Sequence, residues 1–337
     1  MRRRMHARQR GVAIITALLL TTLAITIVGS LFWQQQVQVR SIENQRLQLQ
    51  KQWILRGALD WTRLILREDA RISQTDNLDE PWAVPLAETR LDQYVENART
   101  GNDVPSATLS GGIVDAESRF NLTNLCQGGQ INPTEVDVFA RLLSGQQQNP
   151  ALAQATAELM AAAQGGSAAN GGSTASDGTS TGTSTGTSAG TSGAAGVSDG
   201  SSRPLGILHV DDLLAVPGFT PAALAAIRDY IVVLPRVTPI NVNTAPAEVL
   251  AARIDTLSLS DAAAIVAERK SAWFKDIADF QQRLGGKDLS SGQGEVAVNT
   301  SYFLVNGDVR LDRAGMTMQA LIERSGLITR VVWIRED

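Results

Sequence analysis

Residues 11–33 read GVAIITALLLTTLAITIVGSLFW, and this stretch decides how the chain is organised. No charged residue occurs between Gly11 and Val39, and the apolar run Val12–Trp33 is 22 residues long. A helix of that length rises roughly 33 Å, which is enough to cross the hydrocarbon core of a bilayer. Five arginines lie within residues 1–11, so we expect the N-terminus to stay in the cytoplasm and the rest of the chain to lie outside.

Charge is unevenly distributed along the 337 residues. The formal net charge is −4, but without residues 1–11 the chain has 25 basic and 34 acidic residues, a net charge of −9. This balance excludes a globally basic nucleic-acid binder. The single cysteine, Cys126, excludes an internal disulfide and a thiolate metal cluster. The two histidines, His6 and His209, exclude a histidine-rich metal site.

The apolar run is longer than the core of a cleaved secretory signal, which is roughly 7–15 residues, and no small-x-small cleavage site follows it. A plain signal anchor remains an alternative. Beyond the bilayer, apolar residues recur near helical spacing among Gln, Arg and Glu as far as Ile65. We therefore predict one helix over residues 12–68, apolar all round in its first half and amphipathic in its second.

A basic leader closed by Gly11, directly before the apolar run, resembles the signals of prepilins. The resemblance implies that a prepilin peptidase cuts after Gly11 on the cytoplasmic side and that the new N-terminal residue, Val12, is methylated. Most pilins and pseudopilins carry Glu at the fifth mature position, where this chain has Thr16. The minor pseudopilin K of type II secretion systems is the member type that lacks this Glu.

The segment DAESRFNLTNL, residues 115–125, resembles a signature run of the pseudopilin K family. The positions that match are Asp115, Ser118, Arg119, Phe120, Asn121 and Leu122, with Thr123 in place of Asn. On an extended strand Asp115 and Glu117 would point to one face, with Arg119 following. Such a pair could be catalytic, but we favour a local arrangement of ion pairs and turns that closes a strand.

Residues 165–202 consist almost entirely of Gly, Ser, Thr, Ala, Asn and Asp, and include the repeat TSTGTSTGTS. A segment with so little apolar area cannot offset the entropy of ordering, so we predict a flexible loop. The pseudopilin K family usually has an acidic segment here that is associated with calcium, and this chain lacks it. The resemblance therefore does not support a calcium site, although Asp276, Asp279 and Glu295 are carboxylates that could serve.

Short helices are predicted on both sides of this segment. The residues expected to form them are Pro133–Leu143, Pro150–Ala163, Asp212–Val216, Thr220 to about Leu234, a helix capped by Thr244, Asp261–Lys270 and Ile277–Leu284. Pseudopilin K proteins share the element that contains Asn241, Asn243 and Thr244.

That element and residues 216–219 also resemble helix-hairpin-helix modules, many of which bind DNA phosphates with backbone N–H groups. Thr220 stands where such a hairpin has its second Gly, and residues 254–260 contain no Gly. Residues 205–290 carry 8 basic and 10 acidic side chains, so no positive field attracts phosphate. We do not expect nucleic-acid binding.

The C-terminal part is predicted to be a β-meander, preceded by one strand candidate at residues 90–98. Its predicted strands are Tyr302–Val305, Asp308–Leu311, Met316–Glu323 and Leu327–Ile334, with turns at 306–307, 313–315 and 325–326. The fold class is therefore α+β, a pilin-like helix packed on an antiparallel sheet. The predicted domains are a leader (1–11), the stem (12–68), a pseudopilin domain in two parts (69–130 and 287–337) and an inserted α-helical domain (131–286).

Together, these resemblances imply a minor pseudopilin K that sits at the tip of the pseudopilus, starts its assembly and supports export of folded proteins across the outer membrane. Implied partners are the minor pseudopilins I and J, other pseudopilins, the prepilin peptidase and the inner-membrane secretion platform. We expect no enzyme, because no P-loop, Gly-x-Ser-x-Gly or His-Glu-x-x-His motif occurs. The alternatives are a minor pilin of a type IV pilus and a membrane-anchored DNA-uptake protein.

Overall fold

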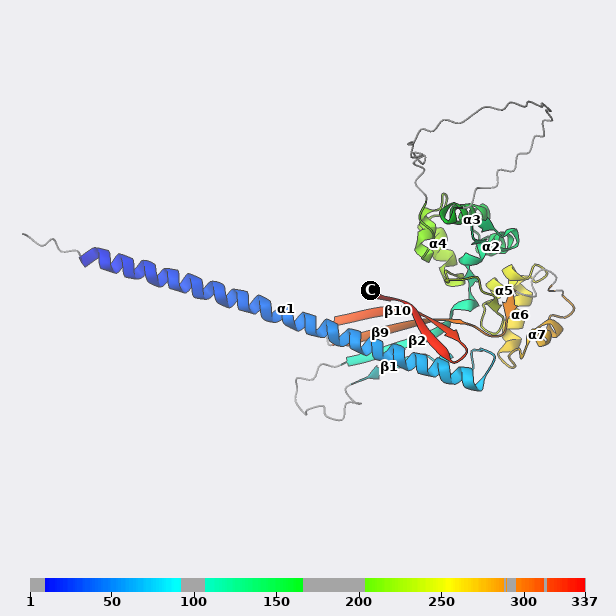
Figure 1. The fold of residues 1–337 in the computed structure, drawn as a ribbon, viewed down its shortest axis with the longest axis horizontal. Coiled ribbons are helices and arrows are strands. Elements are labelled where there is room, and N and C mark those ends of the chain that lie inside the picture. The colour runs from blue at the N-terminus through cyan, green and yellow to red at the C-terminus, as the bar shows by residue number, and fades with distance from the viewer. Residues whose placement is uncertain are drawn as a thin grey trace, which may run out of the picture.

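A computed structural model describes residues 10–91, 107–165, 204–287, 289, 295–311 and 314–336. Helix α1, Arg10–Ile72, is a 63-residue rod whose first half projects away from the rest of the molecule (Figure 1). It confirms the predicted helix over residues 12–68. The large apolar side chains from Ile14 to Trp33 are all exposed, and by length and composition α1 can cross a membrane. These apolar side chains can be removed from water only in a lipid bilayer or against another protein.

The C-terminal half of α1 packs on one face of a five-stranded antiparallel sheet. The strands, in sheet order, are β1 (Leu86–Arg90), β2 (Ala107–Asp115), β9 (Tyr302–Leu311), β10 (Ala314–Ser325) and β11 (Ile328–Glu336). A 3₁₀ turn at Pro81–Ala83 follows α1. We call α1 from Lys51 onward and this sheet the sheet lobe. It confirms the predicted α+β class.

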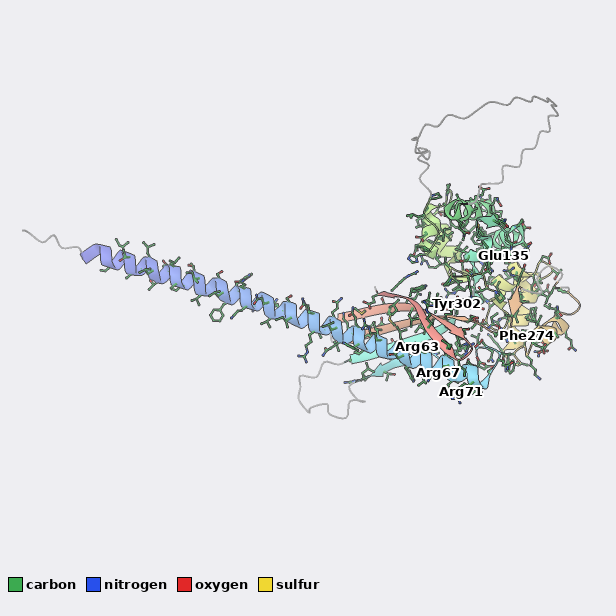
Figure 2. The ribbon with its side chains drawn as sticks, in the orientation of Figure 1. Arg63, Arg67, Arg71, Glu135, Phe274 and Tyr302 are labelled. Carbon is green, nitrogen blue, oxygen red and sulfur yellow. The ribbon has the colours of Figure 1, made fainter. Side chains whose placement is uncertain are left out.

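Leu55, Leu59 and Leu66 of α1 are buried against the sheet. Figure 2 labels three arginines along this part of the helix, Arg63, Arg67 and Arg71. The first of them, Arg63, donates to the main-chain oxygen of Thr329 at 3.1 Å. Lys51 likewise donates to the main-chain oxygen of Gly315 at 3.2 Å. The stem is therefore attached to β10 and β11 by polar contacts as well as by its apolar face.

Strand β9 runs unbroken from Tyr302 to Leu311, so the predicted turn at Asn306-Gly307 is wrong. Gly307 lies under a side chain of α1: a Cβ there would stand 3.3 Å from Cδ2 of Leu55. Its partner across the ladder is Gly111, where a Cβ would collide with the main-chain oxygen of Asn306. Glycine inside a strand often marks such a close approach rather than a turn.

Other strand boundaries also differ from the sequence prediction. The strand expected at residues 90–98 is β1 at 86–90, and residues 92–106 lie outside the described residues. Gly315, expected in a turn, belongs to β10. The turn at Ser325-Gly326 is confirmed, because β10 ends at Ser325 and Gly326 has a φ of 57°.

The described residues between Asp115 and Tyr302 form a second body, which we call the helical lobe (Figure 1). Its α-helices are α2 (Pro133–Gly145), α3 (Ala151–Gln164), α4 (Pro221–Ile227), α5 (Ala247–Arg253), α6 (Leu259–Arg269) and α7 (Ile277–Arg283). Its 3₁₀ turns are Ala116–Ser118, Leu122–Leu125, Val210–Ala215 and Arg228–Tyr230. Three two-stranded ladders complete it: β3 (Phe120–Asn121) with β6 (Ile231–Val232), β4 (Cys126–Gln127) with β5 (Gln130–Ile131), and β7 (Ile240–Asn241) with β8 (Val296–Ala297).

Two helix predictions need correction. Thr220 caps α4 as expected, accepting from the N–H of Ala223, but α4 ends at Ile227 rather than near Leu234. The chain there changes course because β6 pairs with β3. Thr244 is not a cap: α5 starts at Ala247, and the Thr244 hydroxyl donates elsewhere. The segment predicted to be a flexible loop lies, from residue 166 on, outside the described residues.

Each lobe has its own apolar core, and a third, smaller cluster joins them. That cluster lies on the sheet face opposite α1. Val232 and Leu234 of the helical lobe pack there against Leu304 and Leu321 of the sheet. The chain leaves the sheet at Asp115 and returns at Tyr302, and β2 and β9 are neighbouring strands. The inserted body is thus attached at the middle of the sheet. The segment between β2 and β9 is longer than the inserted domain predicted at residues 131–286.

Candidate functional site

A buried polar network lies where the two lobes and the end of α1 meet. We call it the polar junction; its members are Asp69, Asp76, Asp115, Glu117, Asn241, Thr244, Thr300 and Arg324, all buried. They come from the last turn of α1, the loop after it, the end of β2, β7 and its loop, the approach to β9, and β10. One guanidinium, that of Arg324, pairs with two of the four carboxyl groups, Asp69 and Asp76, so hydrogen bonds must stabilise the other two.

Asp115 is the centre of the junction and ends β2. Its Oδ2 accepts from Oγ1 of Thr244 at 2.5 Å and from Nδ2 of Asn241 at 2.9 Å. Its Oδ1 accepts from the N–H of Glu117 at 2.7 Å. Burial raises the pKa of Asp115 to about 6, against the lowering effect of these hydrogen bonds.

Glu117 does not share a strand face with Asp115, so the geometry expected for a carboxylate pair is wrong. Residues Ala116–Ser118 form a 3₁₀ turn, because the Asp115 side chain caps it. Glu117 instead accepts from the N–H of Ser301 at 3.0 Å. Burial, and secondly the charge of Asp115, raise the pKa of Glu117 to about 8. This shift favours the protonated form of Glu117 at neutral pH.

Arg324 of β10 binds the carboxylates that follow the stem. Its Nη2 lies 2.5 and 2.6 Å from the two carboxylate oxygens of Asp76, and its Nη1 lies 2.7 Å from Oδ2 of Asp69. Its guanidinium also stands 4.7 Å above the ring of Phe303. Asp76 accepts in addition from the N–H of Thr300 at 2.7 Å. A bidentate pair of this kind fixes geometry as well as charge.

The asparagines of the family signature are used inside the fold. Asn241 donates to the main-chain oxygen of Asp76 at 3.0 Å as well as to Asp115. Asn243 makes two hydrogen bonds to the backbone of Phe274, at 2.8 and 2.9 Å. Asn121 donates to the main-chain oxygen of Arg236 at 2.7 Å and accepts from the N–H of Leu234 at 3.1 Å. These contacts hold loops together.

The other signature residues surround this network. The Ser118 hydroxyl donates to the main-chain oxygen of Asp115 at 2.7 Å. Phe120 is buried and stacks on Phe139 with ring centroids 5.4 Å apart, and Leu122 is fully buried. Arg119 differs, because its side chain is only partly buried and lines a cleft between the lobes.

A second buried ion pair holds the helical lobe together. Arg253 of α5 donates to Glu135 of α2 at 2.7 and 2.8 Å, and to Glu295 at 2.7 Å. The position of Glu135 is labelled in Figure 2. Glu295 is therefore already paired with a guanidinium. The other carboxylates considered for calcium are engaged as well: Asp276 caps α7, and Asp279 pairs with Arg283 at 2.7 Å.

One group of described carboxylates does lie close together, with oxygens of Asp69, Asp76 and Glu80 within 4.8 Å of one another. Arg324 already pairs with two of them. Glu80 accepts from Nε1 of Trp82 at 2.7 Å, and burial raises its pKa to about 7. A guanidinium thus supplies the positive charge that a metal ion would bring.

No sequence motif marks Asp69, Asp76, Thr300 and Arg324, because no local pattern relates positions so far apart. Of the positions expected to be processed, Gly11 and Val12 lie in the first turn of α1, and Thr16 lies one turn further on and is exposed. The junction and the processing positions are therefore at opposite ends of the stem. The junction carboxylates are bound by donors of the chain itself, and the arrangement joins three parts of the fold.

Comparisons with known proteins agree with these features. Models of the family "Type II secretion system (T2SS), protein K" match residues 118–236 and 240–300. Type II secretion system protein K of Pseudomonas aeruginosa PAO1 is 28% identical over 329 residues, covering 95% of this chain and 90% of that protein. The Klebsiella pneumoniae protein of the same name is 25% identical over 342 residues, covering 97% and 96%.

The fold also has a solved counterpart. A chain in the crystal structure of the GspK-GspI-GspJ complex from the type 2 secretion system of enterotoxigenic Escherichia coli matches with a TM-score of 0.64 and 17% identity. The match covers 88% of this chain and 99% of that chain. The matched family regions contain most of the signature residues that surround the polar junction. On these grounds the chain belongs to the family of type II secretion system protein K.

Proposed function

We propose that this protein is the minor pseudopilin at the tip of a type II secretion pseudopilus, where it starts assembly together with minor pseudopilins I and J. The observation that carries the proposal is the solved chain of the same fold, which was crystallised in a complex of GspK, GspI and GspJ. The assembled pseudopilus then supports export of folded proteins across the outer membrane.

The shape of the molecule supports a tip position. The helical lobe lies beyond the end of the sheet that is farthest from the apolar half of α1 (Figure 1). In a fibre whose stems run along its axis, a subunit stacked above would need the space that this lobe occupies. A subunit with nothing above it meets no such obstacle. The polar junction keeps the lobe in that position.

The proposed topology is a single pass through the inner membrane, with the N-terminus in the cytoplasm and both lobes in the periplasm. The apolar half of α1 and the arginines that precede it support this. The N-terminal mass of protein co-expressed with a prepilin peptidase tests it. We expect a mature chain that starts at methylated Val12. A chain that still starts at Met1, or one cut after residue 30, would refute the prepilin pathway.

The assembly role is tested by deletion and by purification. Cells without the protein should lose exoprotein secretion, and the full-length protein should co-purify with I and J. Loss of twitching with secretion intact would instead indicate a minor pilin of a type IV pilus. A DNA gel shift at low salt that weakens steeply as salt rises would support the DNA-uptake alternative. We expect none, because side chains of the Asn241–Thr244 element bind other parts of the fold.

A further inference from the structure

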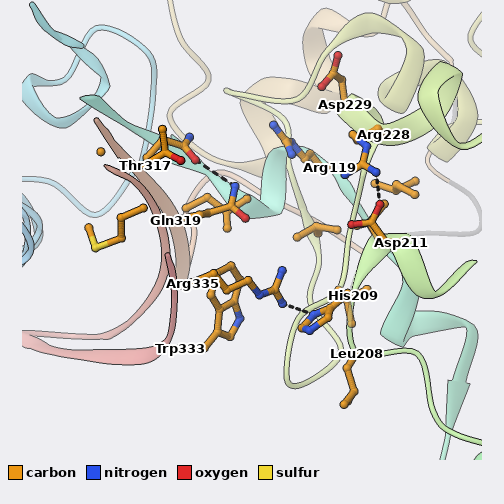
Figure 3. A pocket seen from close by; sticks show the side chains of 18 of the residues that line it. Arg119, Leu208, His209, Asp211, Arg228, Asp229, Thr317, Gln319, Trp333 and Arg335 are labelled. Carbon is orange, nitrogen blue, oxygen red and sulfur yellow. Dashed lines mark hydrogen bonds and ion pairs between the residues drawn. The ribbon is translucent and has the colours of Figure 1, made fainter. Parts of the chain in front are cut away.

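A cleft of about 680 Å³ lies between the two lobes, on the sheet face opposite α1 (Figure 3). Its sheet wall carries Asn306, Gln319, Trp333 and Arg335, and its other wall carries Arg119 and residues 208–211, 228–229 and 231–233. Asn306 and Gln319 hydrogen-bond to each other at 3.0 Å. The cleft is therefore lined by side chains from two bodies, among them three arginines (Arg119, Arg228 and Arg335) and three aspartates (Asp211, Asp229 and Asp308).

Arg119 is a guanidinium of this cleft whose charge is offset only through space, by Asp229 and Asp115. It belongs to the signature run, yet within the described parts of the chain its side chain forms no hydrogen bond and no ion pair. Burial lowers its pKa, and the charges of Asp229 and Asp115 offset this only in part. A guanidinium has five N–H donors, and those of Arg119 are available to an acceptor from outside the chain. The remaining signature residues around it are all engaged inside the fold.

Arg335 faces the cleft from the opposite wall (Figure 3). Its guanidinium stacks on Trp333 at 4.0 Å from the ring centroid and contacts Nδ1 of His209. Stacking and this contact hold its planar fork in one orientation. A guanidinium fixed in this way loses less entropy when it binds an anion than a mobile lysine would.

The aspartates at the cleft offset the charge of Arg119 only in part. Asp211 forms an ion pair with Arg228, and Oδ1 of Asp308 lies 3.6 Å from Arg310. Asp229 is exposed and acts on Arg119 through its charge without a hydrogen bond. Room for a carboxylate therefore remains beside Arg119, in a partly enclosed site where an ion pair is stronger than at an open surface.

We propose that this cleft is the docking site for an acidic side chain of a partner minor pseudopilin, with its carboxylate bound by Arg119 and flanked by Arg335. The choice of a pseudopilin as the partner rests on the proposed function. The choice of a carboxylate rests on the planar, five-donor guanidinium, which matches carboxylate geometry bidentately. Insertion between the lobes also gives the partner contact with both bodies at once, so it would bind only when their relative orientation is correct.

Zero-length cross-linking of the full-length protein, purified in detergent with I and J, tests the contact. Arg119→Lys keeps the positive charge and introduces an amine that a carbodiimide can join to an adjacent carboxylate, with the water taken up as urea. We expect a peptide pair that links position 119 to an Asp or Glu of I or J, and none from the unchanged protein. A link to Asp229 alone, or no link to a partner in an intact complex, would overturn the proposal.

Binding affinity provides a second measurement. Arg119→Gln should weaken binding to I and J at least tenfold and reduce its dependence on salt. It should not lower the unfolding temperature, because the Arg119 side chain forms no hydrogen bond with any residue that the structure describes. Arg330→Gln, an exposed arginine of β11 away from the cleft, is the matched control and should change affinity less than twofold. Equal affinity of both variants would refute the proposal that a partner docks in the cleft, but it would leave the assembly role intact. Failure of the unchanged protein to bind I or J would refute the assembly role itself.

Discussion

Arg324 provides a decisive test of the polar junction, because one side chain holds two carboxylates in a buried place. Replacing it by Met keeps most of the volume but removes the ion pairs to Asp69 and Asp76 and the stacking on Phe303. Removing one partner of a buried ion pair costs about 3–5 kcal/mol, since the other charge stays uncompensated. With two carboxylates left behind, we expect a loss in the upper part of that range at pH 8.

The loss should depend on pH in a definite direction. Without the guanidinium, the buried negative charge beside it can be relieved only by proton uptake, so the pKa of Asp69 in the folded Arg324→Met protein must rise. Burial already raises the pKa of Asp69. The destabilisation should therefore be smaller at pH 5 than at pH 8, because protonation then removes the buried negative charge.

Urea unfolding of the full-length protein in detergent measures this. The control is Arg330→Met, an exposed arginine whose loss should cost less than about 0.5 kcal/mol. Adding Asp76→Asn to Arg324→Met should restore part of the stability, because the amide oxygen can still accept from Thr300 and carries no charge. A loss under 1 kcal/mol for Arg324→Met, about what an ordinary substitution costs, or a loss that Asp76→Asn does not relieve, would refute the reasoning.

Three further outcomes are expected. The pKa of Glu117 is raised in the folded state from 4.5 to about 8, so the stability that its bound proton gives is fully present below about pH 4.5 and is lost as the pH rises through 8. Glu117→Gln should flatten this part of the unfolding free energy against pH, and exposed Glu68→Gln should not. Gly307→Val should cost about 1–3 kcal/mol in thermal unfolding, because its side chain would press on Leu55, and an unchanged transition would contradict the close approach. Thr16→Glu should move the protein from the tip into the fibre body with secretion retained, and an unchanged tip location in labelled fibres would show that the missing carboxylate does not determine position.

The long elements of the fold could be predicted from the sequence because their signals are local. Helix α1 follows from an uninterrupted apolar run and the amphipathic pattern after it, and α2 begins at Pro133 after the Asn132 cap. Strand β9 could not be delimited in this way. Asn306-Gly307 is the usual hairpin pair, but this glycine serves the packing of a helix that is more than two hundred residues away in sequence.

Only some residues of the polar junction could be predicted, because only those lie in a recognisable local motif. Family resemblance identified Asp115, Asn241 and Thr244, and the structure brings these three within hydrogen-bond distance. Their partners Asp76 and Arg324 lie in segments with no motif, and only the folded chain shows that they meet. Conversely, the strand-face geometry expected for Glu117 failed because the side chain of Asp115 caps a 3₁₀ turn directly after the strand.

The polar junction also explains how an insertion in the middle of a sheet can be rigid. Asp115 and Phe303 are paired in register at the ends of β2 and β9, so the two connections to the helical lobe lie side by side and could act as a hinge. The apolar cluster around Leu304 holds the lobes together, but apolar contact has no preferred direction and would permit rotation about that hinge. The hydrogen bonds of Asn241 to Asp76 and Asp115 are directional and reach the loop after the stem and the end of a sheet strand at once. They fix the angle between the lobes, and with it the width of the cleft between Arg119 and Arg335, so a change in the junction should reduce partner binding at the cleft even though no junction residue lines it.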